Sequence, residues 1–266
     1  MLREQRLDAG KTLEELASVI GLTRATISKY ETGKILPSVA TVERLADALG
    51  VDTDQRRALI DAATAAHTEV HAWRAIQTPS FRRRQDEIRA IEAQATQVRV
   101  FQPSIIPGLL QTPQYCQALL ELDRIRPIED MKEAVSSRME RQAALYDEAK
   151  SFAFVLTEGA LRWRIGSASV HAIQLHHLAG LAHLPNVSVG IVPLLAEVGA
   201  RQTNMFAIFD SSAVVIETLT AELTLREEQL IAFYARVFDT LSEHAVYGED
   251  ARTILDGIVT ELRQIG

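Results

Sequence analysis

The segment from Thr12 to Gly33, TLEELASVIGLTRATISKYETG, constrains the fold of this chain more than any other. Apolar residues recur at helical spacing over residues 13–20, Gly21 interrupts the pattern, and a second helical run follows that buries Ile27. Ala17 is small where two helices must approach each other, and Gly21 can adopt the left-handed conformation that a tight turn requires. The spacing therefore predicts two short helices joined as a helix-turn-helix.

Further helices are predicted on both sides of this pair. LREQRLDAG predicts a first helix that ends at Gly10 and points Leu2 and Leu7 inward. Thr12 and Glu15 have the spacing of a capping box for the next helix. Two more helices are expected over residues 38–50, capped by Ser38, and residues 52–66. Together these segments predict a compact five-helix unit.

The residues that point outward at the start of the second helix of the pair are short or cationic, so they can reach base edges and phosphates in a major groove. They are Arg24, Ala25, Thr26, Ser28 and Lys29. The unit resembles the DNA-binding domain of lambda-repressor and Cro-like regulators, the Xre family, and TRATISKYETG is similar to the recognition helix and following turn of that family. The resemblance implies groove contacts from Arg24, Thr26, Ser28 and Lys29, and the full set of expected DNA-binding residues adds Thr12, Thr23, Ala25 and Lys34.

One residue departs from the family pattern. Leu13 stands where the family often has a glutamine that braces the phosphate backbone, so this contact is expected from Thr12 or from the backbone amides at the helix N-terminus. Residues 1–65 contain nine Lys and Arg against ten Asp and Glu, so one such domain should bind DNA weakly. Two domains in a homodimer would read half-sites about one helical turn apart. Apolar stripes over Leu230–Leu241 and Ile254–Ile265 are suited to an interface or to the core.

Length and composition place further bounds on the chain. Its 266 residues predict a helix-turn-helix domain over residues 1–66, a helical connector over 67–97 and a regulatory and dimerisation domain over 98–266. The net charge of -7 argues against a protein that coats nucleic acid without selectivity. A single cysteine, the lack of a signal peptide's apolar core and the lack of a membrane-spanning apolar run predict a cytoplasmic protein that does not enter a membrane.

The connector contains two candidate sites. Arg82, Arg83 and Arg84 stand in a row, which suits either a contact with the DNA backbone or a solvated charge run. His67 and His71 enclose Glu69, but this spacing differs from HExxH because Glu69 would face away from both histidines.

The remainder of the chain predicts an α+β domain with a modest mixed sheet, in a protein that is mainly helical. A strand near Val98 leads to a helix capped by Thr112, and a long helix is expected over Glu129–Tyr146 with Met131, Val135, Met139 and Leu145 inward. FAFVLTE and VSVGIVPL flank a helix in the order of a parallel crossover. MFAIFD and AVVIET predict a hairpin, and two amphipathic helices end the chain.

Several motifs in this part carry a second resemblance. FQPSIIPGLLQTPQYCQALL, SSRMERQAALY, FVLTEGALRWRIG and LPNVSVGIVPL resemble the C-terminal domain of unknown function of actinobacterial regulators of the WhiJ type. The resemblance implies a transcription factor with a regulatory body and, often, a small partner protein encoded nearby. It supplies no catalytic residues.

Enzyme chemistry is not expected. Cys116 lacks an adjacent base, and the chain has no GxSxG, phosphate loop or dinucleotide fingerprint. His171, His176, His177 and His183 lie on one predicted helix, where only His176 and His183 share a face, so no metal or cofactor is expected. Glu158 and Arg162 predict an exposed ion pair. The loops 103–111 and 193–204 suit either a pocket for a small-molecule effector, with candidates Tyr115, Trp163 and Arg201, or ordinary connections.

The sequence thus predicts a DNA-binding transcriptional regulator, a repressor that reads a palindromic double-stranded DNA operator as a homodimer. The alternative is a protein-interaction module or antitoxin-like partner protein whose helix-turn-helix docks protein instead of DNA.

Overall fold

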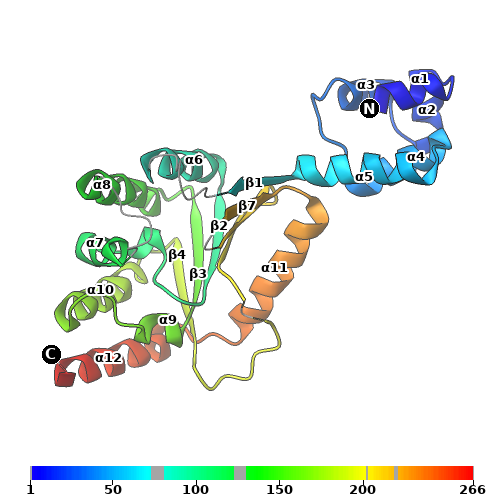
Figure 1. The fold of residues 1–266 in the computed structure, drawn as a ribbon. Coiled ribbons are helices and arrows are strands. Elements are labelled where there is room, and N and C mark those ends of the chain that lie inside the picture. Colours follow the sequence, from blue (N-terminus) through cyan, green and yellow to red (C-terminus); the bar gives the residue numbers. More distant parts are fainter. Residues whose placement is uncertain (1, 73–80, 123–129, 202, 219–220, 266) are drawn as a thin grey trace. The chain divides into compact units, whose positions relative to one another are not determined.

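The computed structural model describes residues 2–72, 81–122, 130–201, 203–218 and 221–265, without the side chains of 67–72, 81–87 and 221. The chain divides into two compact units, one of residues 1–70 with 223–230 and the other of residues 71–222 with 231–266 (Figure 1). Each unit is described by itself. The predicted boundaries at residues 66 and 97 stay a prediction.

The N-terminal unit contains the predicted helix-turn-helix. Thr12 and Glu15 form the predicted capping box, and Gly21 ends the first helix of the pair in the left-handed conformation with φ 68°. Leu16, Ala17 and Ile27 are buried where the two helices pack. The helices of this unit are α1 (Leu2–Asp8), α2 (Leu13–Ile20), α3 (Arg24–Glu31), α4 (Val39–Leu49) and α5 (Thr53–His67).

The first helix differs from its prediction. Leu7 is 57% exposed, whereas Arg6 is buried. The Arg6 guanidinium donates from Nε and Nη2 to the two carboxylate oxygens of Glu31, at 2.6 and 2.9 Å. The prediction of an inward Leu7 was therefore wrong, because a long-range ion pair and not an apolar contact takes the inward position of α1.

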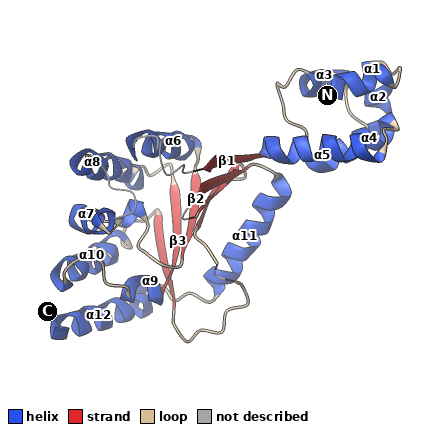
Figure 2. Cartoon of the chain, viewed as in Figure 1, coloured by secondary structure: helices blue, strands red, loops and turns tan. Residues whose placement is uncertain are grey.

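The second unit is built on a mixed sheet (Figure 2). The strands that lie wholly within this unit are ordered β6-β5-β2-β3-β4, as part of a seven-stranded sheet. β2 and β3 are parallel, as are β3 and β4, whereas β5 is antiparallel to β2 and to β6. Both the parallel crossover and the hairpin are confirmed. The strands are β2 (Gln97–Gln102), β3 (Ser151–Thr157), β4 (Val187–Val192), β5 (Phe206–Phe209) and β6 (Ala213–Glu217).

Helices lie on both faces of this sheet (Figure 1). Phe152, Phe154 and Val100 face a core shared with residues of α7, η2, α10 and α12. On the other face the ring of Tyr234 in α11 contacts Phe206 at a centroid distance of 5.0 Å. The helices are α6 (Phe81–Gln94), η1 (Gly108–Leu110), α7 (Pro113–Glu121), α8 (Met131–Arg141), η2 (Gln142–Tyr146), α9 (Glu158–Arg162), α10 (Ala168–Leu181), α11 (Glu228–Glu243) and α12 (Gly248–Ile265).

Two predictions about helices in this unit need correction. The helix expected over Glu129–Tyr146 changes to a 3-10 helix after Arg141, and Glu129 itself lies outside the described residues. The fully buried side chains of α8 are Ala134 and Ser137, whereas the expected Met131, Val135 and Met139 are only half-buried. The apolar stripe of α12 belongs to the core, through residues that include Leu255 and Ile258.

Two strands were not predicted. β1 (Thr68–Ala72) and β7 (Ala221–Leu225) are neighbours, and the division between the units passes through both. Arg82–Arg84 belong to the first turns of α6, but their side chains, like those of His67, Glu69 and His71, lie outside what the structure describes. In the described part of the chain, every helix is too short or too polar to cross a bilayer.

Candidate nucleic-acid interface

The helix α3 presents a short polar surface to solvent. Arg24, Ala25 and Lys29 are exposed, Thr26 and Ser28 are half-buried, and Ile27 on the opposite side is fully buried. This division follows from helical geometry, since residues three and four apart share a face. The side chains that were expected to reach DNA therefore lie together on α3, and Lys34 is exposed just after it.

Two threonines fix the start of α3. The backbone N–H of Thr26 donates to the Thr23 hydroxyl at 3.2 Å, so Thr23 is the N-cap. The hydroxyls of Thr23 and Thr26 lie 2.8 Å apart, and either can be the donor. Because one hydroxyl of this pair keeps its proton for another acceptor, the pair can still donate to a phosphate oxygen.

Both donors of Thr12, the residue before α2, are already used within the fold. Glu15 Oε2 accepts from the backbone N–H of Thr12 at 2.7 Å and from its hydroxyl at 2.9 Å. The backbone N–H of Thr12, followed by its hydroxyl, holds the pKa of Glu15 below its ordinary value. A phosphate at Thr12 would have to displace this carboxylate, so the structure leaves the expected Thr12 contact without an available donor.

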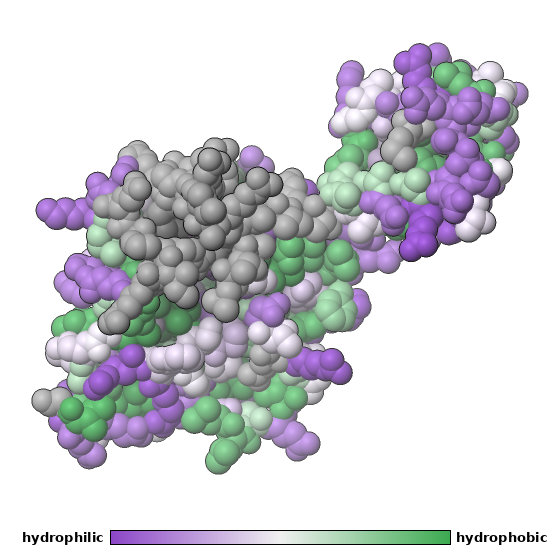
Figure 3. Space-filling model, viewed as in Figure 1, coloured by the Kyte–Doolittle hydropathy of each residue, from purple (hydrophilic) through white to green (hydrophobic). Residues whose placement is uncertain are grey.

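A second carboxylate lies beside α3. Glu14, in the first turn of α2, places Oε1 3.0 Å from Nε of Arg24, and both side chains are about two-thirds exposed, at 64% and 67%. The N-terminal unit is mainly hydrophilic on the face shown in Figure 3. Its polar surface carries both signs of charge, in agreement with the nearly neutral composition of residues 1–65.

Partly buried polar contacts hold α2 and α3 in place. Besides the Glu31 contacts, Arg6 donates from Nη1 to the carbonyl of Lys11 at 2.8 Å, which ties the turn before α2 to α1. Arg44 of α4 donates to the carbonyl of Ile20 at the end of α2. Neither arginine could be predicted from the sequence, because their partners are distant in sequence or are backbone carbonyls.

The three candidates for the effector pocket differ in their exposure to solvent. Tyr115 is fully buried, its hydroxyl accepts from the backbone N–H of Ile106 at 3.4 Å, and burial raises its pKa to about 12. Trp163 is 65% exposed, and Arg201 is exposed in the loop after β4. None of the three lines the hollow of about 740 Å³ described next, or a smaller hollow beside α6 and α8.

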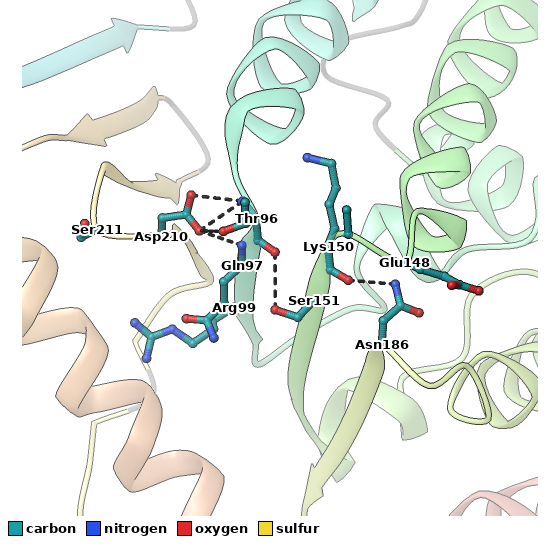
Figure 4. A pocket seen from close by; sticks show the side chains of 10 residues that line it. Thr96, Gln97, Arg99, Glu148, Lys150, Ser151, Asn186, Asp210 and Ser211 are labelled. Atoms are coloured by element: carbon teal, nitrogen blue, oxygen red, sulfur yellow. Dashed lines mark hydrogen bonds between the residues drawn. The ribbon is translucent and has the colours of Figure 1, made fainter.

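The larger hollow, of about 740 Å³, lies at the amino ends of β2 and β3, which is the edge opposite to the expected one (Figure 4). Asp210, with φ 49°, accepts there from the backbone N–H groups of Thr96 and Gln97. Lys150 donates from Nζ to the carbonyls of Glu92, Ala93 and Ala95 at the end of α6. Three donors of one ammonium group are thus used within the fold.

The loop from β2 to α7 is held by glutamine side chains that the sequence analysis missed. Gln174 of α10 donates from Nε2 to the carbonyl of Leu110 and accepts from the backbone N–H of Thr112, both at 2.6 Å. Gln111 donates to the carbonyl of Ile106 at 2.7 Å, and Gln142 donates to the carbonyl of Gln111 at 2.6 Å. Their spacing in sequence gives no signal of this arrangement.

Two of the residues considered for enzyme chemistry, Cys116 and His171, lie in the core, whereas His176 and His183 are exposed. Cys116 is buried in α7, and burial raises the pKa of its thiol. His171 is also buried: Nδ1 accepts from the backbone N–H of Ile165 at 3.2 Å, so Nε2 is the donor to the carbonyl of Leu161 at 2.7 Å. Among the described residues, no three His, Cys, Asp or Glu side chains group in a way that could hold a metal ion.

The Glu158 and Arg162 pair forms as expected, at 2.6 Å, but it is not simply exposed. Glu158 is 12% exposed and also accepts from the backbone N–H of Leu194 at 3.0 Å. Arg162 forms a second ion pair with Glu261 of α12, at 2.6 Å. The pair therefore connects α9, the loop after β4 and α12.

Comparison with known families gives two matches. A helix-turn-helix domain model matches residues 1–59, and the model of a domain of unknown function, DUF5753, matches residues 85–257. An "uncharacterized HTH-type transcriptional regulator" of Methanothermobacter thermautotrophicus is 46% identical over 50 residues, which are 19% of this chain and 72% of that protein. The prophage-derived HTH-type regulator YonR of Bacillus subtilis is 38% identical over 53 residues, 20% of this chain and 49% of that protein.

Solved structures give only a distant likeness. The phospholipase D family member Nuc from Salmonella typhimurium has a TM-score of 0.39 at 10% identity, over 68% of this chain and 97% of its own. NucT from Helicobacter pylori has a TM-score of 0.40 at 10% identity, over 68% of this chain and 98% of its own. The archaeal chromatin protein TrmBL2 has a TM-score of 0.36 at 10% identity, over 76% of this chain and 65% of its own. Likeness at this level carries no inference about function.

Proposed function

This chain belongs to the family of the domain of unknown function DUF5753 and carries a helix-turn-helix domain before that region, and on this basis we propose that it is a sequence-specific DNA-binding transcriptional regulator. Two HTH-type transcriptional regulators match the N-terminal part of the chain, which supports the same assignment. The C-terminal region then acts as a regulatory body without enzymatic activity. Such a regulator works on the chromosome in the cytoplasm.

The observation that carries this proposal is the surface of α3. Arg24, Ala25 and Lys29 are exposed on a helix whose other side is fixed by the buried Ile27 and by the Arg6 and Glu31 pair. In helix-turn-helix proteins the N-terminal residues of the second helix contact base edges in the major groove. We assign this role to α3, with Thr23, Thr26, Ser28 and Lys34 as additional contacts to bases or phosphates.

A repressor that binds as a homodimer to a palindromic operator accounts best for the charge of the N-terminal unit. Glu14 and Glu15 lie at the start of α2, and the unit has no excess of basic residues. One copy would gain little from phosphate contacts, whereas two linked copies gain from effective concentration. A small partner protein or a small-molecule effector bound to the second unit would supply the signal.

Selection of bound duplexes from a random DNA pool by the full chain, at near-physiological salt, tests this proposal. A two-fold symmetric motif is the expected result, with half-sites about one helical turn apart. A folded protein that enriches no motif would contradict sequence-specific binding. Sedimentation at micromolar concentration tests the dimer separately, because only monomers with and without the selected duplex would exclude it.

A further inference from the structure

Arg24 and Glu14 form a contact that contributes little to the stability of the fold. Arg24 is the first residue of α3, and its Nε lies 3.0 Å from Glu14 Oε1 in α2. Both side chains are mostly in solvent, and exposed ion pairs contribute little to stability. The pair nevertheless joins the two helices of the helix-turn-helix at the surface that we assign to DNA.

The geometry leaves the outer part of the guanidinium unused. Glu14 approaches Nε, and in the described part of the chain neither terminal amino group of Arg24 makes a hydrogen bond. Guanine presents two acceptors, O6 and N7, in the major groove, and arginine commonly donates to both. The neighbouring Ala25 is too short to stand between this guanidinium and a base.

We infer that Arg24 reads a guanine in each half-site and that Glu14 is a positioning residue that orients its guanidinium. This inference rests on the proposed function. A guanidinium held before binding loses less conformational freedom when it meets the base, so the base is selected more strongly. The Glu14 carboxylate also repels phosphates, so the same residue lowers the affinity for all duplexes. Glu14 would thus raise selectivity at the expense of overall affinity.

A contact from Arg24 to a phosphate is the competing assignment. A phosphate contact carries no sequence information, so removing Arg24 or Glu14 would then change the affinity for all duplexes alike. The two assignments differ in one measurable quantity, the base preference at a single position of each half-site.

The test repeats the duplex selection with the parent chain, Glu14→Ala, Glu14→Gln and Arg24→Ala. We expect the parent to prefer guanine at one position per half-site. In Arg24→Ala this preference for guanine over the other bases should fall at least about fivefold. Glu14→Ala should lose a comparable part of the preference while binding a scrambled duplex more tightly. Glu14→Gln should lie between the two, because a neutral amide orients the guanidinium less strongly.

Two controls make the result specific. Glu43→Ala removes another glutamate that forms an exposed ion pair, with Arg56 at 3.6 Å on α4 and α5, and it should leave every base preference unchanged. Combining Glu14→Ala with Arg24→Ala should give the preference of Arg24→Ala alone. Circular dichroism confirms that each variant is folded.

The outcomes separate the two proposals. If the parent selects a motif and Glu14→Ala keeps the full guanine preference, the role of Glu14 is excluded and the proposed function stands. If Arg24→Ala weakens all duplexes equally, the guanine contact is excluded. If the folded parent selects no motif, the proposed function and this inference fall together.

Discussion

Arg6 of α1 and Glu31 of α3 form a buried ion pair with two hydrogen bonds, and their side chains are only 9% and 6% exposed. Glu31 is the last residue of α3, so this pair fixes the C-terminal end of that helix while its N-terminal end remains exposed. The ion pair therefore sets the orientation in which α3 presents Arg24 and Lys29.

Removing one partner of this pair should destabilise the N-terminal unit. Arg6→Ala leaves Glu31 as an unpaired buried charge, which costs about 3 to 5 kcal/mol. Hydrogen exchange of the α1 and α3 amides should become faster, because the free energy of opening falls. Glu43→Ala breaks an exposed pair and should change that free energy by less than about 1 kcal/mol. Unchanged exchange in Arg6→Ala would show that the pair does not hold α3.

Lys29 is expected to contact phosphate. Lys29→Ala should weaken binding to all duplexes alike and lower the slope of log affinity against log salt by about 1. Fluorescence anisotropy titrations at several salt concentrations measure this slope. Lys132→Ala, an exposed lysine of α8, is the matched control. A base-specific loss in Lys29→Ala would instead place this side chain on a base edge.

His171 should make the second unit sensitive to acid. Burial, opposed in part by its backbone hydrogen bonds, lowers the pKa of His171, and the charge of Arg164 adds to the lowering. The unfolded chain therefore takes up a proton below about pH 6.5 that the folded chain does not. Stability is complete above that pH and falls as the pH decreases, by up to about 1.4 kcal/mol per pH unit.

Denaturant unfolding at pH 7.5 and pH 5.5 measures this loss. His176→Asn, at an exposed position of the same helix, is the matched control for the substitution itself. His171→Asn should be less stable at pH 7.5 and should show a smaller difference between the two pH values. An equal difference in parent and His171→Asn would assign the pH dependence to other groups.

Gln174 should be essential for the loop between β2 and α7. Gln174→Leu removes the partner of the Leu110 carbonyl and of the Thr112 N–H, and each buried group left unsatisfied costs about 1 to 3 kcal/mol. Gln117→Leu, at an exposed position of α7, should stay within about 0.5 kcal/mol of the parent. Thermal unfolding measures the stability of both variants. A Gln174→Leu variant as stable as Gln117→Leu would show that Gln174 does not hold this loop.

Local patterns predicted much of this fold because their physical causes are local. The Thr12 capping box, the left-handed Gly21 and the buried Ile27 depend on residues a few positions apart, and all are present. The parallel β3 and β4 followed equally from a strand, helix and strand in order. Such features can be predicted because steric rules and hydrogen-bond geometry act within one or two turns of chain.

The remainder depended on contacts that local patterns do not encode. The burial of Arg6 was not predicted, because its partner Glu31 is 25 residues away in the sequence. β1 was missed since TEVHA has no alternating apolar pattern, and the buried side of α8 is set by its neighbours in the core. At the candidate interface the outward side of α3 followed from periodicity, whereas the contact of Glu14 with Arg24 required the packing of α2 against α3.

The most direct test of the account is the ratio of two affinities of the full chain, measured by anisotropy at near-physiological salt. One duplex carries the selected motif, and the other is a scrambled duplex of the same composition. The account predicts a ratio of about 1,000 or more, the usual lower range for sequence-specific proteins. Equal affinity for the two duplexes, or no binding to either by folded protein, would contradict it.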